Sequence, residues 1–213
     1  MPVLLKQHKL FYADVPKVAC SSIKRMFFEI ENGFEFQAFK ANAKHWHIHT
    51  FYPGCLRGDF PEAVIQEYRR LAVVRDPIER FLSAYGNRVV HYGEASDQAV
   101  KKLGFFSRLK ADPDLGEFID SLEKYIEIPS LNWHCKPMVE FLGSDPSYFH
   151  AIYDIRQMDD FVSDVSKTVG SEVKAGRHQA GGPKFSRNDL NTKQVAKLEA
   201  FYSEDYKAFS RYF

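Results

Sequence analysis

The stretch "LFYADVPKVACSSIKRMF", residues 10–27, carries an apolar run into a helical pattern through a turn that contains a lysine and two serines. Residues 10–15 form a short β-type run, which a proline then interrupts. Beyond the turn, apolar side chains recur at i, i+3, i+4 and i+7 on one helical face: Ile23, Met26, Phe27 and Ile30. We therefore expect strand, turn and helix in this order, with the helix beginning near Ser21 or Ser22, both good N-caps.

A second stretch, "LAVVRDPIERFLSAYGNRV" (residues 71–89), repeats this order. The continuous apolar run LAVV is typical of a strand buried on both faces of a parallel sheet. Asp76 is expected to cap the following helix, with Pro77 at its first position and Glu79 at its third. The order strand, helix, strand, helix predicts an α/β fold, a three-layer, P-loop-like arrangement in which helices flank a central parallel sheet.

Other segments also have periodic patterns. "KHWHIHTFY" (44–52) alternates three histidines with other residues, which predicts a strand with the three imidazoles on one face. "FPEAVIQEYRR" (60–70) is typical of a helix with proline in its first turn. We also expect a helix over 116–127, a strand and then a helix over 149–170, and a last helix from Asn191 or Thr192 with Val195, Leu198, Tyr202 and Phe209 as its apolar positions.

The composition is that of a globular protein. The 213 residues are 45% hydrophobic and 27% charged, without an internal repeat or linker, so we expect a single domain over residues 1–213. A formal net charge of +1 gives no general attraction to polyanions, which argues against a nucleic-acid partner and requires any anion site to be local. No apolar run is long enough to span a bilayer. Three cysteines without C-x-x-C spacing indicate reduced intracellular thiols.

The turn after the first strand is a candidate phosphate site. First-turn N–H groups lack partners within a helix, and the helix dipole favours negative charge there. The expected ligands are the N–H groups of residues 18–22, the hydroxyls of Ser21 and Ser22, and the ammonium of Lys17. The turn lacks the nucleotide-loop signature G-x-x-x-x-G-K-[ST]. An ordinary capped helix with an exposed lysine is the alternative interpretation.

Arg75 and Ser83 form a second candidate site. Arg75 comes directly after the predicted buried strand, where open α/β sheets bind ligands. An arginine fork and a serine hydroxyl on the next helix suit a second phosphate. Alternatively, Arg75 forms a salt bridge with Glu79 or Asp76, and Ser83 is a small packing residue.

Together, "VPKVACSSIKRMF" and "VVRDPIERFLSAYGNRV" resemble the two cofactor motifs of the Golgi-type carbohydrate sulfotransferases (sulfotransferase family 2-like) and their bacterial relatives. In that family the first motif is the 5′-phosphosulfate loop and the second is the 3′-phosphate motif. The cofactor is 3′-phosphoadenosine 5′-phosphosulfate (PAPS), and the chemistry needs no metal. Weaker likenesses follow at "NWHCKPM" (132–138) and "YDIRQMDDFVSDV" (153–165), so the resemblance covers most of the chain.

The resemblance implies a role for each residue of the two motifs. Lys17 would contact the 5′-phosphate and the oxygen that bridges it to the sulfonate, and would stabilise the leaving phosphate. The residues that would cradle the 5′-phosphate are Val18, Ala19, Cys20, Ser21 and Ser22. Arg75 and Ser83 would bind the 3′-phosphate. Alanine stands at position 19, where the family commonly has glycine, and this tightens the turn without excluding it.

The acceptor hydroxyl needs a base, and histidine titrates in a suitable range. The family's base lies between the two cofactor motifs, and "HIHTFY" is similar to the H-x-H before an aromatic residue in some uronyl 2-O-sulfotransferases. This likeness favours His49, then His47, with His45 peripheral. The three histidines alternatively form a metal site, or at least one is structural. Carboxylates are further candidates for the base: Glu35, Asp59 and Glu62.

Two other regions carry candidate residues. By the resemblance His134 lies near the site, with packing and catalysis both open. The loop over 174–188 either closes over the cofactor, grips an anionic acceptor or is simply solvated, and its basic residues are Lys174, Arg177, His178, Lys184 and Arg187. Aromatic residues of the less periodic segments suit sugar stacking but also suit a core: Phe51, Tyr52, Phe60, Tyr92, Phe105 and Phe106.

The expected function is transfer of a sulfonyl group from PAPS to a hydroxyl acceptor, which the resemblance makes a carbohydrate, by in-line attack on sulfur. The donor product is adenosine 3′,5′-bisphosphate. Because no anchor is seen, we expect a bacterial cytoplasmic enzyme; an excised Golgi lumenal domain would more often show paired cysteines. The alternatives are a non-catalytic nucleotide- or glycan-binding module and a small P-loop kinase of related fold. The kinase would need a Walker lysine–threonine pair and a magnesium carboxylate, and neither is found.

Overall fold

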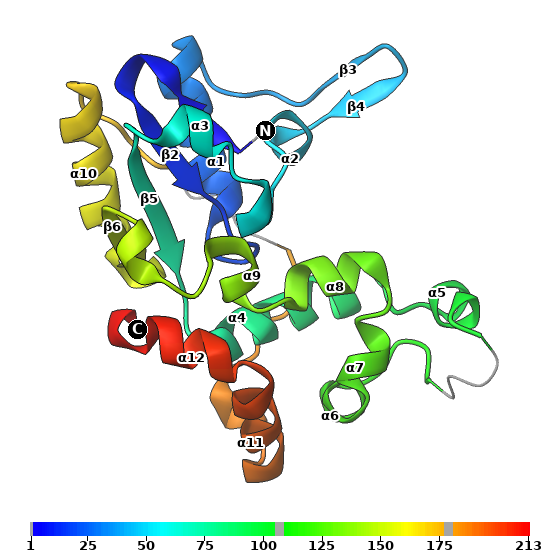
Figure 1. Ribbon diagram of the computed structural model, residues 1–213. Coiled ribbons are helices and arrows are strands. Elements are labelled where there is room, and N and C mark those ends of the chain that lie inside the picture. The colour runs from blue at the N-terminus through cyan, green and yellow to red at the C-terminus, as the bar shows by residue number, and fades with distance from the viewer. Residues whose placement is uncertain (1, 105–108, 177–180) are drawn as a thin grey trace. The chain divides into compact units, whose positions relative to one another are not determined.

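Strands β2 (Leu10–Ala13) and β5 (Arg69–Val74) pair in parallel at the centre of a sheet. The structure is a computed structural model that describes residues 2–104, 109–176 and 181–213. Strand β6 (Ala151–Asp154) extends the sheet beside β5 in parallel, and β1 (Val3–Leu5) lies antiparallel to β2. The strand order is β1-β2-β5-β6 (Figure 1). The predicted α/β class, with a mostly parallel central sheet flanked by helices, is confirmed.

The chain forms two compact units. Unit 1 comprises 1–75, 138–178 and 211–213, and unit 2 comprises 76–137 and 179–210. Besides the sheet, unit 1 contains a two-stranded hairpin of β3 (Phe39–Ala41) and β4 (Lys44–Trp46), and the helices α1 (Cys20–Asn32), α2 (Ile48–Phe51), α3 (Glu62–Ile65), α9 (Met138–Leu142) and α10 (Met158–Val169). The single domain expected over 1–213 stays a prediction.

Unit 2 is helical. Its helices are α4 (Pro77–Ala84), a π-helix (Tyr85–His91), α5 (Asp97–Lys102), α6 (Leu115–Asp120), α7 (Leu122–Tyr125), α8 (Pro129–Cys135), α11 (Thr192–Phe201) and α12 (Ser203–Phe209). Short 3₁₀ helices in the chain are Lys6–His8, Arg57–Asp59, Pro146–Tyr148, Ile155–Gln157, Arg187–Asp189 and Ser210–Tyr212.

The core of unit 1 is aromatic. Successive side chains of a strand point to opposite faces of a sheet. On one face the ring of Tyr12 packs against Phe27 of α1 and Phe161 of α10, with ring centroids 5.5 and 5.8 Å away. On the other face Phe11 packs edge-on against Phe60 at 4.9 Å. Helices α1 and α10 therefore cover the same face of the sheet.

The core of unit 2 surrounds α4. The ring of Phe81 lies 5.8 Å from that of Phe118 and 6.4 Å from that of Tyr202. Arg80 is completely buried in the same region, where Nη1 donates to the carbonyl of His134 at 3.1 Å and Nη2 to that of Lys136 at 2.5 Å. The guanidinium thus fixes the end of α8 to α4.

The predicted starts of α4 and α11 are confirmed. Asp76 caps α4, since its Oδ1 accepts from the N–H of Glu79 at 3.0 Å, and Pro77 is the first helical residue. Helix α1 ends before Gly33, which has φ 77°, a left-handed conformation that glycine adopts without strain. Asn191 caps α11 as expected, but the predicted last helix is broken after Phe201 into α11 and α12.

The strand predicted over 44–52 is wrong. Strand β4 ends at Trp46, because its partner β3 offers only Phe39–Ala41 for pairing. His47 instead caps helix α2, with Nδ1 accepting from the N–H of His49 at 3.2 Å. Figure 1 shows the β3–β4 hairpin extending away from the sheet of unit 1.

The helix predicted over 60–70 is too long. Helix α3 ends at Ile65, and Arg69 and Arg70 belong to β5, where they pair with Leu10 and Phe11 of β2. Backbone pairing with a neighbouring strand therefore outweighs the helical periodicity of this segment.

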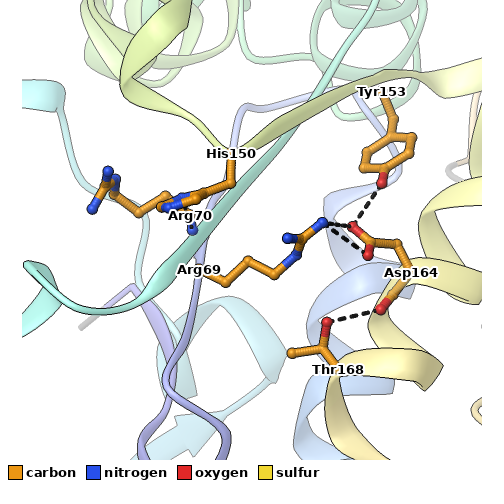
Figure 2. Close-up of polar contacts among 6 residues, drawn as sticks. All are labelled: Arg69, Arg70, His150, Tyr153, Asp164 and Thr168. Carbon is orange, nitrogen blue, oxygen red and sulfur yellow. Dashed lines mark hydrogen bonds and ion pairs between the residues drawn. The ribbon is translucent and has the colours of Figure 1, made fainter.

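A polar cluster joins β5, β6 and α10 (Figure 2). Arg69 Nη2 donates to both carboxylate oxygens of Asp164 at 2.9 and 2.8 Å, and the hydroxyl of Tyr153 donates to Oδ2 of Asp164 at 2.7 Å. Although partial burial opposes ionisation, the bonds from Arg69 and Tyr153 lower the pKa of Asp164 below its ordinary value. Arg69 is the first residue of β5, whereas Tyr153 lies one residue before the end of β6, so the cluster ties both strands to α10.

We expect Asp164 to contribute to acid lability. Because its pKa is lowered on folding, the stabilisation is present above its ordinary pKa of 3.8 and is lost as the pH falls through the folded pKa. Urea unfolding at pH 7 and at pH 3 should show a smaller loss on acidification in Asp164→Asn than in the native chain. Asp160→Asn, on the same helix, is the matched control and should lose as much unfolding free energy between pH 7 and pH 3 as the native chain. Equal losses in the native chain and both variants would contradict the assignment.

Within the ranges that the structure describes, no helix has the length and apolar character needed to cross a membrane.

Candidate active site

The loop between β2 and α1 has an unusual backbone. Lys17 has φ 70° and Ala19 has φ 61°, so two residues with side chains lie in the left-handed region. Such a conformation costs about 1–2 kcal/mol for a non-glycine residue. Left-handed residues in a turn are typical of backbone nests that bind anions. The strain in this loop is therefore consistent with a ligand-binding turn.

Helix α1 begins at Cys20 with Ala19 as its N-cap, and Ala19 provides no side-chain hydrogen bond. The expectation that Ser21 or Ser22 would cap the helix is wrong, because both lie inside the first turn. Ser22 is buried and Ser21 is half-buried. The start of α1 is thus a helix N-terminus without a side-chain cap, beside two hydroxyl groups and Lys17.

A cavity of about 680 Å³ opens beside this loop within unit 1. Ala19 and Ser22 form part of its wall, with Arg156 and Asp159 near the start of α10 and Lys174 from the following loop. The volume is in the range of small-molecule sites. A ligand anion held by the loop would border this cavity.

His49 lies against the start of α1. Its Nε2 is 2.7 Å from Oγ of Ser21, and its Nδ1 is 3.5 Å from Nζ of Lys24. Lys24 Nζ also lies 2.5 Å from Oδ2 of Asp14, and the two side chains are only 1% and 6% exposed. Asp14 follows β2 directly and Lys24 lies on α1, so the ion pair joins the two elements that flank the candidate phosphate loop.

The three histidines lie in a row, although no continuous strand carries them. Ring centroids are 6.1 Å apart for His45 and His47, and 6.0 Å apart for His47 and His49. Burial, then His45 and then Lys24 lower the pKa of His47 below its ordinary value, so that its ring is neutral at pH 7. In the described part of the chain, no group of three or more histidine, cysteine or acidic side chains is placed to hold a metal ion.

Arg75 and Ser83 are placed on the elements that the sequence predicts. Arg75 directly follows β5, at the same sheet edge as the Lys17 loop, because β2 and β5 are parallel neighbours. Ser83 lies on α4 in unit 2 and is half-buried.

The other candidates have mainly local contacts. Glu62 accepts from Arg57 at 2.5 Å and from the hydroxyl of Tyr148 at 3.0 Å, whereas Glu35 and Asp59 are exposed. His134 Nδ1 lies 2.7 Å from the carbonyl of Ser130 on its own helix.

The basic loop over 174–188 is only partly described. Lys174 and Lys184 are exposed, and Arg187 donates to Glu199 at 2.8 Å. Arg177 and His178 lie outside the described residues. A role for this loop in binding stays a prediction.

The candidate stacking residues divide between core and surface. Tyr52 and Phe60 are buried, while Phe51 and Tyr92 are exposed. Phe105 and Phe106 lie outside the described residues.

All three cysteines are free thiols. Burial, followed by the charge of Asp14, raises the pKa of Cys20, and burial raises the pKa of Cys135 to about 12. The thiol of Cys20, the first residue of α1, therefore stays protonated at pH 7.

Sequence reasoning missed Asp14 and Lys24. The available signal was weak: an acid at the carboxyl end of a predicted buried strand, and a lysine next to Ile23 on a helix that packs its apolar face inward. Burial of both side chains, and the distance between them, needed the structure.

The sheet edge, the strained loop and the helix N-terminus define an α/β protein with a candidate anion-binding site after its first parallel strand. The model of the sulfotransferase family matches residues 3–212, and the chain belongs to that family. The matched segment runs through the residues of both units.

Curated relatives match over a shorter segment. Human carbohydrate sulfotransferase 9 is 33% identical over 89 residues, which is 40% of this chain and 19% of the relative. Carbohydrate sulfotransferase 11 of rat and of mouse are each 29% identical over 89 residues, 40% of this chain and 25% of the relative. The matches thus span between about a fifth and a quarter of the relatives' length. No solved structure matches.

Proposed function

We propose that this protein transfers a sulfonyl group from PAPS to a hydroxyl of a carbohydrate. The observation that carries the proposal is the strained Lys17–Ser22 loop at the start of α1, in a chain that belongs to the sulfotransferase family. The carbohydrate acceptor is proposed because the matched relatives are named carbohydrate sulfotransferases.

The residues of the loop fit a phosphate ester. An uncapped helix N-terminus, two left-handed residues and the hydroxyls of Ser21 and Ser22 offer several hydrogen-bond donors close together. Lys17 adds a compact positive charge, and Arg75 offers a guanidinium fork at the same sheet edge for the 3′-phosphate. The assignment of Ser83 to the 3′-phosphate rests on the family resemblance.

The bound donor would supply an activated sulfonyl group with a phosphate as its leaving group. Lys17 is proposed to stabilise the negative charge that develops at the bridging oxygen, together with the dipole of α1. These groups are fixed before reaction, which lowers the cost of reorganisation.

The proposed base is His49 or His47. For His49, acceptance of a proton at Nε2 requires release of its contact with Ser21. For His47, acceptance at Nδ1 requires release of its cap to the N–H of His49. His47 has the more exposed ring, and its lowered pKa keeps it neutral and able to accept a proton at pH 7.

Calorimetric titration without metal tests the donor site. We expect adenosine 3′,5′-bisphosphate to bind more tightly than 5′-AMP or ATP, and Arg75→Ala to weaken its binding by about tenfold or more, because a charge-assisted hydrogen bond is lost. Lys9→Ala removes an exposed positive charge from the same unit and should leave binding unchanged. Equal binding of the three nucleotides would overturn the proposed donor.

A further inference from the structure

Four polar side chains of unit 1 form a continuous row that ends at the candidate phosphate loop. The contacts run from Asp14 Oδ2 to Lys24 Nζ at 2.5 Å, from Lys24 Nζ to His49 Nδ1 at 3.5 Å, and from His49 Nε2 to Ser21 Oγ at 2.7 Å. The row begins at a buried ion pair and ends in the first turn of α1.

The chemistry of these groups determines which side chain donates and which accepts in each hydrogen bond of the row. An ammonium has only donors, so Lys24 donates to Asp14 and presents a proton to Nδ1 of His49. Neutral imidazole carries one proton, and with Nδ1 as the acceptor that proton lies on Nε2. His49 then donates to Oγ of Ser21, so that the hydroxyl proton of Ser21 points elsewhere.

Burial makes this arrangement rigid. Moving the ammonium of Lys24 away from Asp14 would leave an unpaired charge in the protein interior, which is strongly unfavourable. Oδ1 of Asp14 is itself buried without a hydrogen-bond partner among the described residues, so the carboxylate depends on Lys24 for compensation. Lys24 is therefore held where it selects the tautomer of His49.

We infer that His49 is a positioning residue, oriented by the buried Lys24–Asp14 pair, that makes Ser21 a hydrogen-bond donor to the anion on the loop. This inference rests on the proposed function for the identity of that anion, the 5′-phosphate of the donor. It leaves the role of base to His47 in the histidine row.

Two substitutions of His49 separate positioning from proton transfer. Glutamine places an amide N–H near the position of Nε2 but does not accept a proton at neutral pH, whereas alanine removes the donor. We expect His49→Gln to bind adenosine 3′,5′-bisphosphate within about threefold of the native chain, because its amide N–H replaces the donor at Nε2. We expect His49→Ala and Ser21→Ala each to weaken binding of adenosine 3′,5′-bisphosphate about tenfold. The double variant should bind as tightly as either single variant, because both changes remove the same interaction.

His8→Gln, the same change elsewhere in unit 1, is the matched control and should alter nothing. Loss of turnover in His49→Gln with unchanged binding in both His49 variants would overturn the inference and assign proton transfer to His49. Additive losses in the double variant would also overturn it, because Ser21 and His49 would then act independently.

The tautomer is measurable without any ligand. In ¹⁵N-labelled protein, long-range ¹H–¹⁵N correlation spectra should show the His49 proton on Nε2, with His49→Gln identifying the signals. A proton on Nδ1 would overturn the inference even if the donor site is confirmed. Failure of the native chain to bind adenosine 3′,5′-bisphosphate would instead overturn the proposed function, and the spectrum would still test the hydrogen-bonded row.

Discussion

Replacing Lys17 with alanine is expected to slow sulfonyl transfer by about 10²–10³-fold, the usual loss when one preorganised group that stabilises transition-state charge is removed. The ammonium is proposed to act on charge that develops at the leaving phosphate, so the effect should appear mainly in kcat. Binding of adenosine 3′,5′-bisphosphate should weaken as well, since Lys17 also contacts the phosphate in the proposed site.

The backbone of the loop makes this substitution informative. Lys17 has φ 70°, and alanine has the same steric cost as lysine in this conformation. The substitution therefore removes the ammonium without changing the backbone strain of the loop. Steady-state rates with PAPS and an accepted carbohydrate provide the measurement, and Lys17→Arg should restore part of the rate by restoring the charge. Unchanged turnover in Lys17→Ala would remove Lys17 from the proposed mechanism.

The Arg80→Ala variant should lose about 4 kcal/mol of unfolding free energy in unit 2. Arg80 is fully buried and donates to the carbonyls of His134 and Lys136. Each carbonyl left without its donor costs about 1–3 kcal/mol, and the removed side chain leaves a cavity beside Tyr202.

The two tryptophans allow unit 2 to be followed by itself. Trp133 lies on α8 in unit 2 and Trp46 lies in unit 1, so Trp46→Phe leaves Trp133 as the fluorescent reporter for urea unfolding. In that background Lys101→Ala, an exposed change on α5, should stay within about 0.5 kcal/mol of the parent. A loss below about 1 kcal/mol for Arg80→Ala would show that α8 does not depend on these bonds.

The sequence predicts best where a local signal and the final packing agree. The run LAVV and the cap at Asp76 both appear as predicted in β5 and α4, because buried parallel strands are apolar throughout and an aspartate before proline suits a helix start. The 60–70 segment fails because Arg69 and Arg70 pair with β2, a partner far away in the sequence.

For the candidate site, the structure tests only which elements carry the predicted residues. Lys17 lies in the turn before α1, and Ser21 and Ser22 lie in its first turn, so the predicted order of strand, turn and helix holds although the predicted cap does not. The alternation of histidines over 45–49 predicted a strand, but only His45 lies on one, and His47 is a helix cap. The Asp14–Lys24 pair depends on burial, which sequence periodicity does not report for a single lysine on a helix.

The route of the chain through the two units has a consequence for synthesis on the ribosome. Residues 76–137 of unit 2 are inserted between β5 and β6 of unit 1. The central sheet cannot be completed until Asp154 has emerged from the ribosome. While the insertion is translated, β5 therefore has an edge without its partner strand β6. At about 5–20 residues per second this interval lasts several seconds, long enough for chaperones to bind. Unit 1 is therefore expected to fold only after the inserted residues have been translated. Its folding yield is then expected to depend on protection of the unpaired edge of β5.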